Sequence, residues 1–177
     1  MSRRNPGNPL RGIVLSSKAL LLNLSETEAS QKPAPDKWSP KEIIGHLIDS
    51  ASNNHQRFVR AQFKRDMIFA GYEQEKWVII QHYQKRSWKE LVELWVQYNL
   101  QLAHLMIHTP NELRRRPVTE HNLHQIAFKR VTEGETTSLQ YFMVDYVAHL
   151  EHHLSQIFPD YQAILEPYEN NLYSKSI

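Results

Sequence analysis

Apolar side chains recur at three- and four-residue steps in four long stretches of the chain, a spacing that gathers them on one face of an α-helix. The stretches run from Pro9 to about Leu24, from Pro40 to about Lys64, from Ser87 to Thr109 and from Ser138 to about Ile157. Amphipathic helices must bury these faces against one another. The pattern therefore predicts an all-α protein folded as a four-helix bundle.

Capping signals support three of the predicted helix starts. Residues 39–42 read Ser-Pro-Lys-Glu, which combines a serine N-cap, a proline at the first helical position and a glutamate at the reciprocal capping position. Residues 87–90 read Ser-Trp-Lys-Glu and repeat the serine and the glutamate. Thr137 is expected to cap the last helix, and Pro159 to end it.

The other segments divide the chain into one domain and two tails. Residues 1–8 and 161–177 show no helical pattern, so we expect a disordered N-terminal tail and a C-terminal tail around a bundle domain over residues 9–160. Residues 111–136 are expected to form a long crossover connection between the third and fourth helices. A short helix is predicted over residues 76–84.

Composition narrows the classes of protein to which the chain can belong. Of 177 residues, 41% are hydrophobic and 5 are glycine, which favours helices over a turn-rich β fold. No cysteine is present, which excludes disulfides, cysteine-bound metals and a thiol nucleophile of the chain itself. Because a chain without disulfides suits a reducing compartment, we expect a cytoplasmic location. The net charge is +2, without a long basic run or an apolar stretch of membrane-spanning length. We therefore expect neither nucleic acid nor a membrane as a partner.

Histidines are concentrated in the last predicted helix. His149 and His153 fall on its apolar face at i, i+4 spacing, which lets two imidazoles reach one cation. His152 falls toward the edge of that face. Leu150 stands where zinc proteases with this histidine spacing carry a catalytic glutamate, so that class is excluded. Two ligands from one helix leave a metal ion underbound, and a third must come from another element.

His46 is the best candidate for the third ligand, because it faces inward on the second predicted helix. Ser50 lies on the same side of that helix, and Asn54 lies nearer the middle of its apolar face. Three neutral histidines would leave a coordination position open, as in catalytic sites. Alternatively, these are core histidines with one hydrogen bond each, and Ser50 and Asn54 bond to each other or to a buried water.

Further residues are candidates for a pocket or for packing. Asp145 precedes His149 by one helical turn and could accept a hydrogen bond from a ligand imidazole, or it could be an exposed carboxylate. Tyr146 could point its hydroxyl into the pocket, or it could be a buried structural tyrosine. Residues 114–116 are three arginines, expected to be solvated, with an anion site as the alternative. Trp38 is expected to be a packing residue.

Three motifs, in this order, resemble those of the DinB-like superfamily, also called the YfiT-like metal-dependent hydrolases. Residues 38–47 read Trp-Ser-Pro-Lys-Glu-Ile-Ile-Gly-His-Leu, residues 134–139 read Gly-Glu-Thr-Thr-Ser-Leu, and residues 149–157 contain the pattern His-xxx-His-xx-Gln-Ile. The resemblance covers about residues 10–160. It implies a four-helix bundle with crossed connectivity.

The resemblance also implies a metal site formed by His46, His149 and His153, where the divalent ion is usually nickel or zinc in that family, and a homodimer. Members of the superfamily include transferases and isomerases that use low-molecular-weight thiols. We therefore expect a metal-dependent enzyme with a small-molecule substrate, either a hydrolase that activates water or an S-transferase that activates a low-molecular-weight thiol. The alternative is a non-catalytic stress-related or interaction bundle whose metal site is vestigial.

Overall fold

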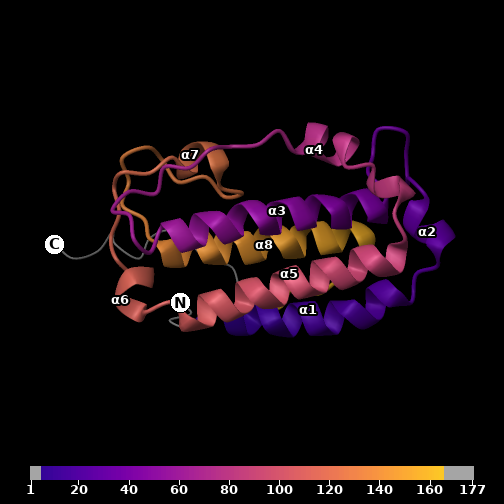
Figure 1. Ribbon diagram of the computed structural model, residues 1–177, viewed down its shortest axis with the longest axis horizontal. Coiled ribbons are helices and arrows are strands. Elements are labelled where there is room, and N and C mark those ends of the chain that lie inside the picture. Colours follow the sequence, from indigo (N-terminus) through magenta and orange to yellow (C-terminus); the bar gives the residue numbers. More distant parts are fainter. Residues whose placement is uncertain (1–4, 166–177) are drawn as a thin grey trace.

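The computed structural model describes residues 5–165, which are helical apart from two isolated β-bridges and the connecting segments. Four long helices form a bundle: α1 (Gly7–Leu22), α3 (Pro40–Arg60), α5 (Trp88–His108) and α8 (Leu139–Ile157) (Figure 1). The predicted all-α four-helix bundle is confirmed.

Short helical segments lie in the connections between the long helices. They are α2 (Glu26–Ser30), α4 (Gln74–Ile80), the 3-10 helix η1 (Tyr83–Lys85), α6 (Asn111–Arg114) and α7 (Leu123–Ile126). The short helix predicted before the third long helix is therefore present as two pieces, α4 and η1.

The long helices are not arranged in space as they follow one another in the chain. α1 packs against α5, α5 against α3, and α3 against α8 (Figure 1). α1 and α5 are antiparallel, because the indole of Trp88 at the start of α5 donates to the carbonyl of Leu21 at the end of α1 (2.8 Å). α3 and α5 start at the same end of the bundle, and α8 runs antiparallel to α3 (Figure 1). The connectivity is crossed, as the resemblance implied.

The parallel arrangement of α3 and α5 requires the segment between them to return along the bundle. The long connection predicted between the third and fourth long helices is present, and it begins and ends at one end of the bundle (Figure 1). The two connections lie side by side, since Met67 bridges to His121. Next to this bridge, the Asn122 side chain accepts from the N–H of Phe69 (3.1 Å) and donates to its carbonyl (2.8 Å).

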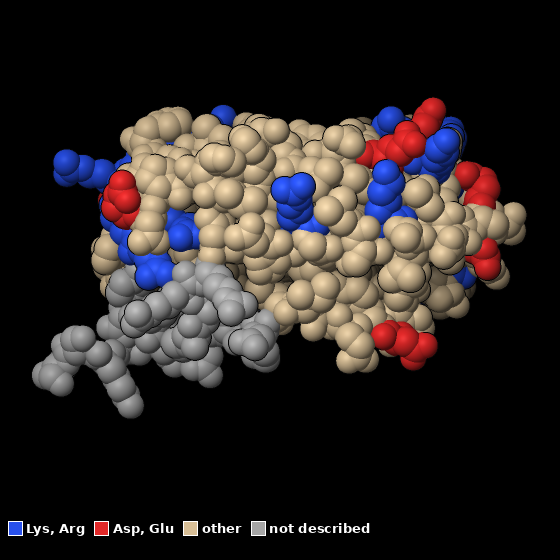
Figure 2. Space-filling view, turned by 90° about the horizontal axis from the view of Figure 1, so that it is seen from below, with Lys and Arg blue, Asp and Glu red and all other residues tan. Residues whose placement is uncertain are grey.

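The core consists of the apolar faces of the four long helices. Trp95, Phe58 and Phe142 are among its largest fully buried side chains, and the last two meet edge to face with ring centroids 5.5 Å apart. On the outer face formed by α1, charged side chains are scattered rather than gathered in a patch (Figure 2). None of the helices described here combines the length and apolar character that a membrane span requires.

Three helix boundaries test the capping signals. Ser39 and Glu42 form the predicted reciprocal capping box of α3. Ser138, rather than Thr137, caps α8, because the backbone of Thr137 pairs in both directions with Val118 (2.9 Å each). α3 ends at Arg60, earlier than predicted. At Thr137, backbone pairing with a residue far away in the chain thus competes with the local capping signal.

The N-terminal end of the folded domain extends beyond its predicted limit. α1 begins at Gly7, and the side-chain amide of Asn5 donates to the carbonyls of Met106 and Ile107 at 2.8 and 3.1 Å. Residues 5–8 therefore lie in the folded domain rather than in the predicted tail. Residues 1–4 lie outside the described residues.

The C-terminal end also extends further than predicted. The buried carboxylate of Glu151 accepts hydrogen bonds from the hydroxyl of Tyr161 (2.9 Å) and from the N–H groups of Ile164 (2.6 Å) and Leu165 (3.0 Å). These contacts hold residues 161–165 against α8, so this part of the predicted tail is docked. Residues 166–177 lie outside the described residues.

Candidate metal centre

His46 is carried by α3, the helix with the proline and the complete capping box at its start. The side chain is fully buried, and the neighbouring Ile44 and Leu47 are buried as well. Gly45 lets the ring of Tyr83 lie directly on the helix, because a methyl group at this position would overlap that ring. The η1 segment is thereby held against the first half of α3, next to the turn that carries His46.

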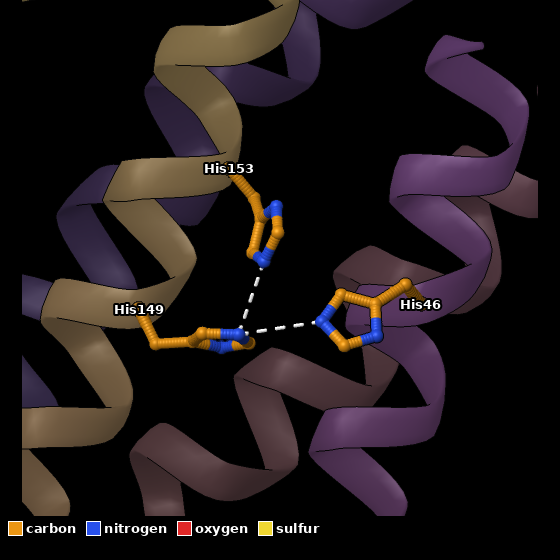
Figure 3. Close-up of side chains that lie close together, drawn as sticks. All are labelled: His46, His149 and His153. Atoms are coloured by element: carbon orange, nitrogen blue, oxygen red, sulfur yellow. Dashed lines mark hydrogen bonds between the residues drawn. The ribbon is translucent and has the colours of Figure 1, made fainter. Parts of the chain in front are cut away.

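His149 and His153 lie one turn apart on α8 and face His46 across the helix interface (Figure 3). The Nε2 atom of His149 is 3.3 Å from Nε2 of His46 and 3.1 Å from Nε2 of His153. One ligand atom from each of the three side chains lies within 4.8 Å of the others. The structure thus brings together the three histidines that the sequence analysis singled out.

The three nitrogens cannot satisfy one another by hydrogen bonding. An imidazole nitrogen carries either one proton or one lone pair, so Nε2 of His149 can form a good hydrogen bond with only one of its two neighbours. Nδ1 of His153 lies 2.8 Å from Oε1 of Gln156, which is an acceptor, so the proton of that ring is on Nδ1 and the lone pair on Nε2. A cation that accepts lone pairs from all three nitrogens resolves this conflict, and the residues therefore fit a divalent metal ion.

The protonation states suit the same role. Burial and the neighbouring His153 lower the pKa of His46 to about 3. Burial lowers the pKa of His149 well below its usual range, and the surrounding histidines lower it further. Burial also lowers the pKa of His153, although the hydrogen bond with Gln156 raises it. All three imidazoles are neutral near pH 7, as metal ligation requires.

Two aromatic side chains flank the histidines. The ring centroid of Trp38 lies 5.1 Å from that of His46 and 6.5 Å from that of His153. The ring of Phe128 lies 5.4 Å from that of His149. The sequence predicts Trp38 only as a packing residue, because a proline-containing segment before a helix does not indicate which side chains it will contact.

A cavity of about 340 Å³ borders the centre on the side of His149. Its lining includes all four residues predicted as pocket candidates, Ser50, Asn54, Asp145 and Tyr146. The lining was not fully predicted from the sequence, since it also draws on the two connections that lie side by side. These contribute Gly71, Tyr72, Gln125, Ile126, Ala127, Phe128 and Arg130.

Two of the candidates have structural partners. Asp145 is buried rather than exposed, and its carboxylate accepts from the N–H groups of Phe128 (2.8 Å) and Lys129 (2.7 Å). It therefore fixes the segment that carries Phe128 beside the centre. Tyr146 is a buried structural tyrosine whose hydroxyl donates to Oδ1 of Asn99 on α5 (2.5 Å).

The other two candidates bond to each other within α3. The amide of Asn54 donates to the carbonyl of Ser50 (2.9 Å) and reaches its hydroxyl oxygen (3.3 Å). This is the mutual hydrogen bonding expected in the alternative without a metal. It still leaves both side chains in the wall of the cavity.

Other polar residues take no part in the centre. His152 is exposed, in agreement with its predicted place at the edge of the apolar face. The arginine run is not simply solvated: Arg114 is buried and donates to Asn111 (2.9 Å), and Arg116 donates to the carbonyl of Ala61 (3.2 Å). The bond from Arg116 holds the connection to the end of α3.

Comparison with known proteins agrees with this fold. The family model described as the DinB superfamily matches residues 16–157. The chain belongs to the DinB superfamily. Among solved structures, this DinB superfamily bundle is similar to YfiT from Bacillus subtilis, described as a probable metal-dependent hydrolase with an unusual four-helix bundle topology. The TM-score is 0.70 at 15% sequence identity, over 87% of this chain and 82% of that one. No curated protein sequence matches the chain significantly.

Proposed function

We propose that this DinB superfamily chain is a metal-dependent enzyme in which His46, His149 and His153 hold a divalent ion, nickel or zinc. The observation that carries the proposal is the close approach of three neutral imidazoles. Nε2 of His149 lies 3.3 Å from Nε2 of His46 and 3.1 Å from Nε2 of His153. The description of YfiT as a probable metal-dependent hydrolase supports it.

A divalent ion at this position supplies Lewis-acid chemistry, which makes water or a thiol nucleophilic near neutral pH. Other residues of the chain orient and cover the three histidines. Gln156 sets the tautomer of His153, and the ring of Trp38 covers His46 and His153. The cavity beside His149 leaves room for a small-molecule substrate.

The reaction we propose is hydrolysis or the transfer of a low-molecular-weight thiol to an electrophile. In the first reaction the nucleophile is water, and in the second it is the sulfur of the incoming thiol, because the chain has no cysteine of its own. Assays of the nickel- and zinc-loaded protein with a panel of esters and amides, and with a thiol plus an electrophile, separate the two. Activity in neither panel would favour the non-catalytic alternative.

Elemental analysis of the purified protein tests the centre directly. After loading with nickel or zinc and removal of free ions, the wild-type chain is expected to hold a stoichiometric amount of metal. His46→Ala, His149→Ala and His153→Ala are expected to lose it, whereas the exposed neighbour His152→Ala keeps it. Metal that stays bound in all three alanine variants would refute the assignment of the ligands.

A further inference from the structure

Arg57 on α3 is a buried cation whose charge has no anionic partner in residues 5–165. Its side chain is 6% exposed. It donates to the carbonyl of Ala70 (2.7 Å), lies 3.5 Å from Oδ1 of Asn54, and packs 6.0 Å from the ring centre of Tyr72. The ion pairs of the described residues do not include it. Since burying an unpaired charge is costly, this guanidinium calls for an anion.

Arg57 lines the same cavity as His149. Arg130 lines it as well and is exposed, so it lies where the cavity meets solvent. Asp145 is the acidic residue of this lining, and its carboxylate already accepts two backbone N–H groups. Two arginines against one carboxylate leave the lining of the cavity with a net positive charge, which a metal ion at the histidines would increase.

Tyr72 also lines the cavity. Burial raises the pKa of Tyr72 to about 12, although a hydrogen bond with Ser50 lowers it. The phenol therefore stays protonated at neutral pH and does not compete with an anion for the arginines.

We propose that the cavity binds the anionic group of the substrate, a carboxylate or a phosphate, between Arg57 and Arg130, with the rest of the substrate directed towards the three histidines. Calling this ligand a substrate rests on the proposed function, whereas the binding of an anion by the two arginines does not. A guanidinium suits both kinds of group, because its planar fork matches two oxygens of either one. The volume of about 340 Å³ limits the ligand to a small molecule.

Calorimetric titration of the full-length, nickel-loaded protein with succinate, methyl phosphate and the neutral succinamide tests the proposal. Succinate or methyl phosphate is expected to bind saturably, the tighter of the two identifying the preferred group, and succinamide is not. Arg57→Gln and Arg130→Gln should each weaken the binding at least about tenfold, since each removes a charge-assisted hydrogen bond. Arg60→Gln, which removes an exposed arginine of the same helix, should leave it unchanged.

Two further variants keep the test decisive. Arg57→Lys keeps the charge but loses the fork, so it should bind more weakly than wild type even if Arg57→Gln does not fold. His153→Ala is expected to lose metal and keep anion binding, because His153 does not line the cavity. Anion binding that disappears only in His153→Ala, or that persists in both arginine variants, would overturn the inference. If the wild-type protein holds no metal but its anion binding still depends on the arginines, only the proposed metal centre would be overturned.

Discussion

Gln156 orients one of the three histidines of the candidate metal centre. Its Oε1 atom lies 2.8 Å from Nδ1 of His153 and leaves the Nε2 lone pair of that ring directed at the centre. Groups that orient a ligand in this way commonly contribute a large share of metal affinity. In the sequence, Gln156 stands out only as part of a family motif, and the contact with His153 gives this residue a physical role.

Replacing Gln156 by leucine should weaken nickel binding about tenfold or more, because His153 is then free to rotate and to change tautomer. Competition titration with a chromophoric chelator measures the affinity. Ser155→Ala is the matched control, because Ser155 directly precedes Gln156 and is also exposed on α8. This variant should bind nickel as the wild type does. Equal affinities in Gln156→Leu and Ser155→Ala would contradict the role assigned to the amide.

Asp49 is a buried carboxylate on α3, one turn after His46. Its Oδ1 atom accepts from the hydroxyl of Tyr83 (2.7 Å) and from the amide of Gln81, while Oδ2 is buried without a partner in the described residues. Burial raises the pKa of Asp49 to about 6, and the bonds from Tyr83 and Gln81 oppose that rise. The folded state therefore binds this proton more tightly than the unfolded state does.

The sign of this pKa shift sets a pH dependence of stability. A raised carboxyl pKa contributes stability that is fully present below the unfolded value near 4 and is lost as the pH rises through about 6. The stability of Asp49→Asn relative to wild type should therefore increase by about 1 to 3 kcal/mol between pH 4 and pH 7. Urea unfolding at both pH values measures it. A difference independent of pH would show that Asp49 titrates normally.

At the scale of elements, α3 must accept close packing at one face and present His46 at another. Gly45 lies under the ring of Tyr83 and Gly7 lies against the carbonyl of Ala103, whereas Gly12 on α1 has open space where a side chain would be. The helical pattern alone treats all three glycines as equally unfavourable, so it does not distinguish a required glycine from a replaceable one.

Gly45→Ala and Gly12→Ala form a matched pair. Gly45→Ala should destabilise the protein by about 2 kcal/mol or more, because the methyl group displaces the Tyr83 ring and its bond to Asp49. Gly12→Ala should stabilise it by about 0.5 to 1 kcal/mol through helix propensity. Thermal and urea unfolding compare the two. An unchanged free energy of unfolding in Gly45→Ala would mean that η1 is not held tightly against α3.

At the scale of the whole molecule, the candidate centre joins two helices that are distant in the chain. His46 lies 103 residues before His149, and the two come together because α3 and α8 pack antiparallel. Metal at this point would bridge the helices only in the folded state, since unfolding separates the ligands. Metal binding and fold stability are therefore linked.

Nickel at about one hundred times its dissociation constant should stabilise the wild-type protein by about 2.7 kcal/mol, equivalent to about 5 to 10 °C in melting temperature. His46→Ala should show little of this rise, because only the two ligands of α8 remain. Differential scanning calorimetry with and without nickel measures both proteins, and His152→Ala serves as the control. An equal rise in His46→Ala would place the stabilising ion elsewhere.

The sequence by itself determined the four long helices, the cap of α3 and the selection of His46, His149 and His153. These features follow from apolar spacing and from side chains that bond within a few residues, and both are local properties. Periodicity also set His152 aside, and the structure leaves that residue exposed.

Only the tertiary structure decided what surrounds the histidines. The contacts of Trp38, the buried position of Asp145 and the cavity with Arg57 and Arg130 depend on how the two long connections lie across the bundle. Such connections have no repeating pattern, and their course is set by contacts between segments far apart in the chain, such as the bonds between Phe69 and Asn122. The three histidines could therefore be selected from helix geometry, whereas the cavity beside them could be found only from the fold.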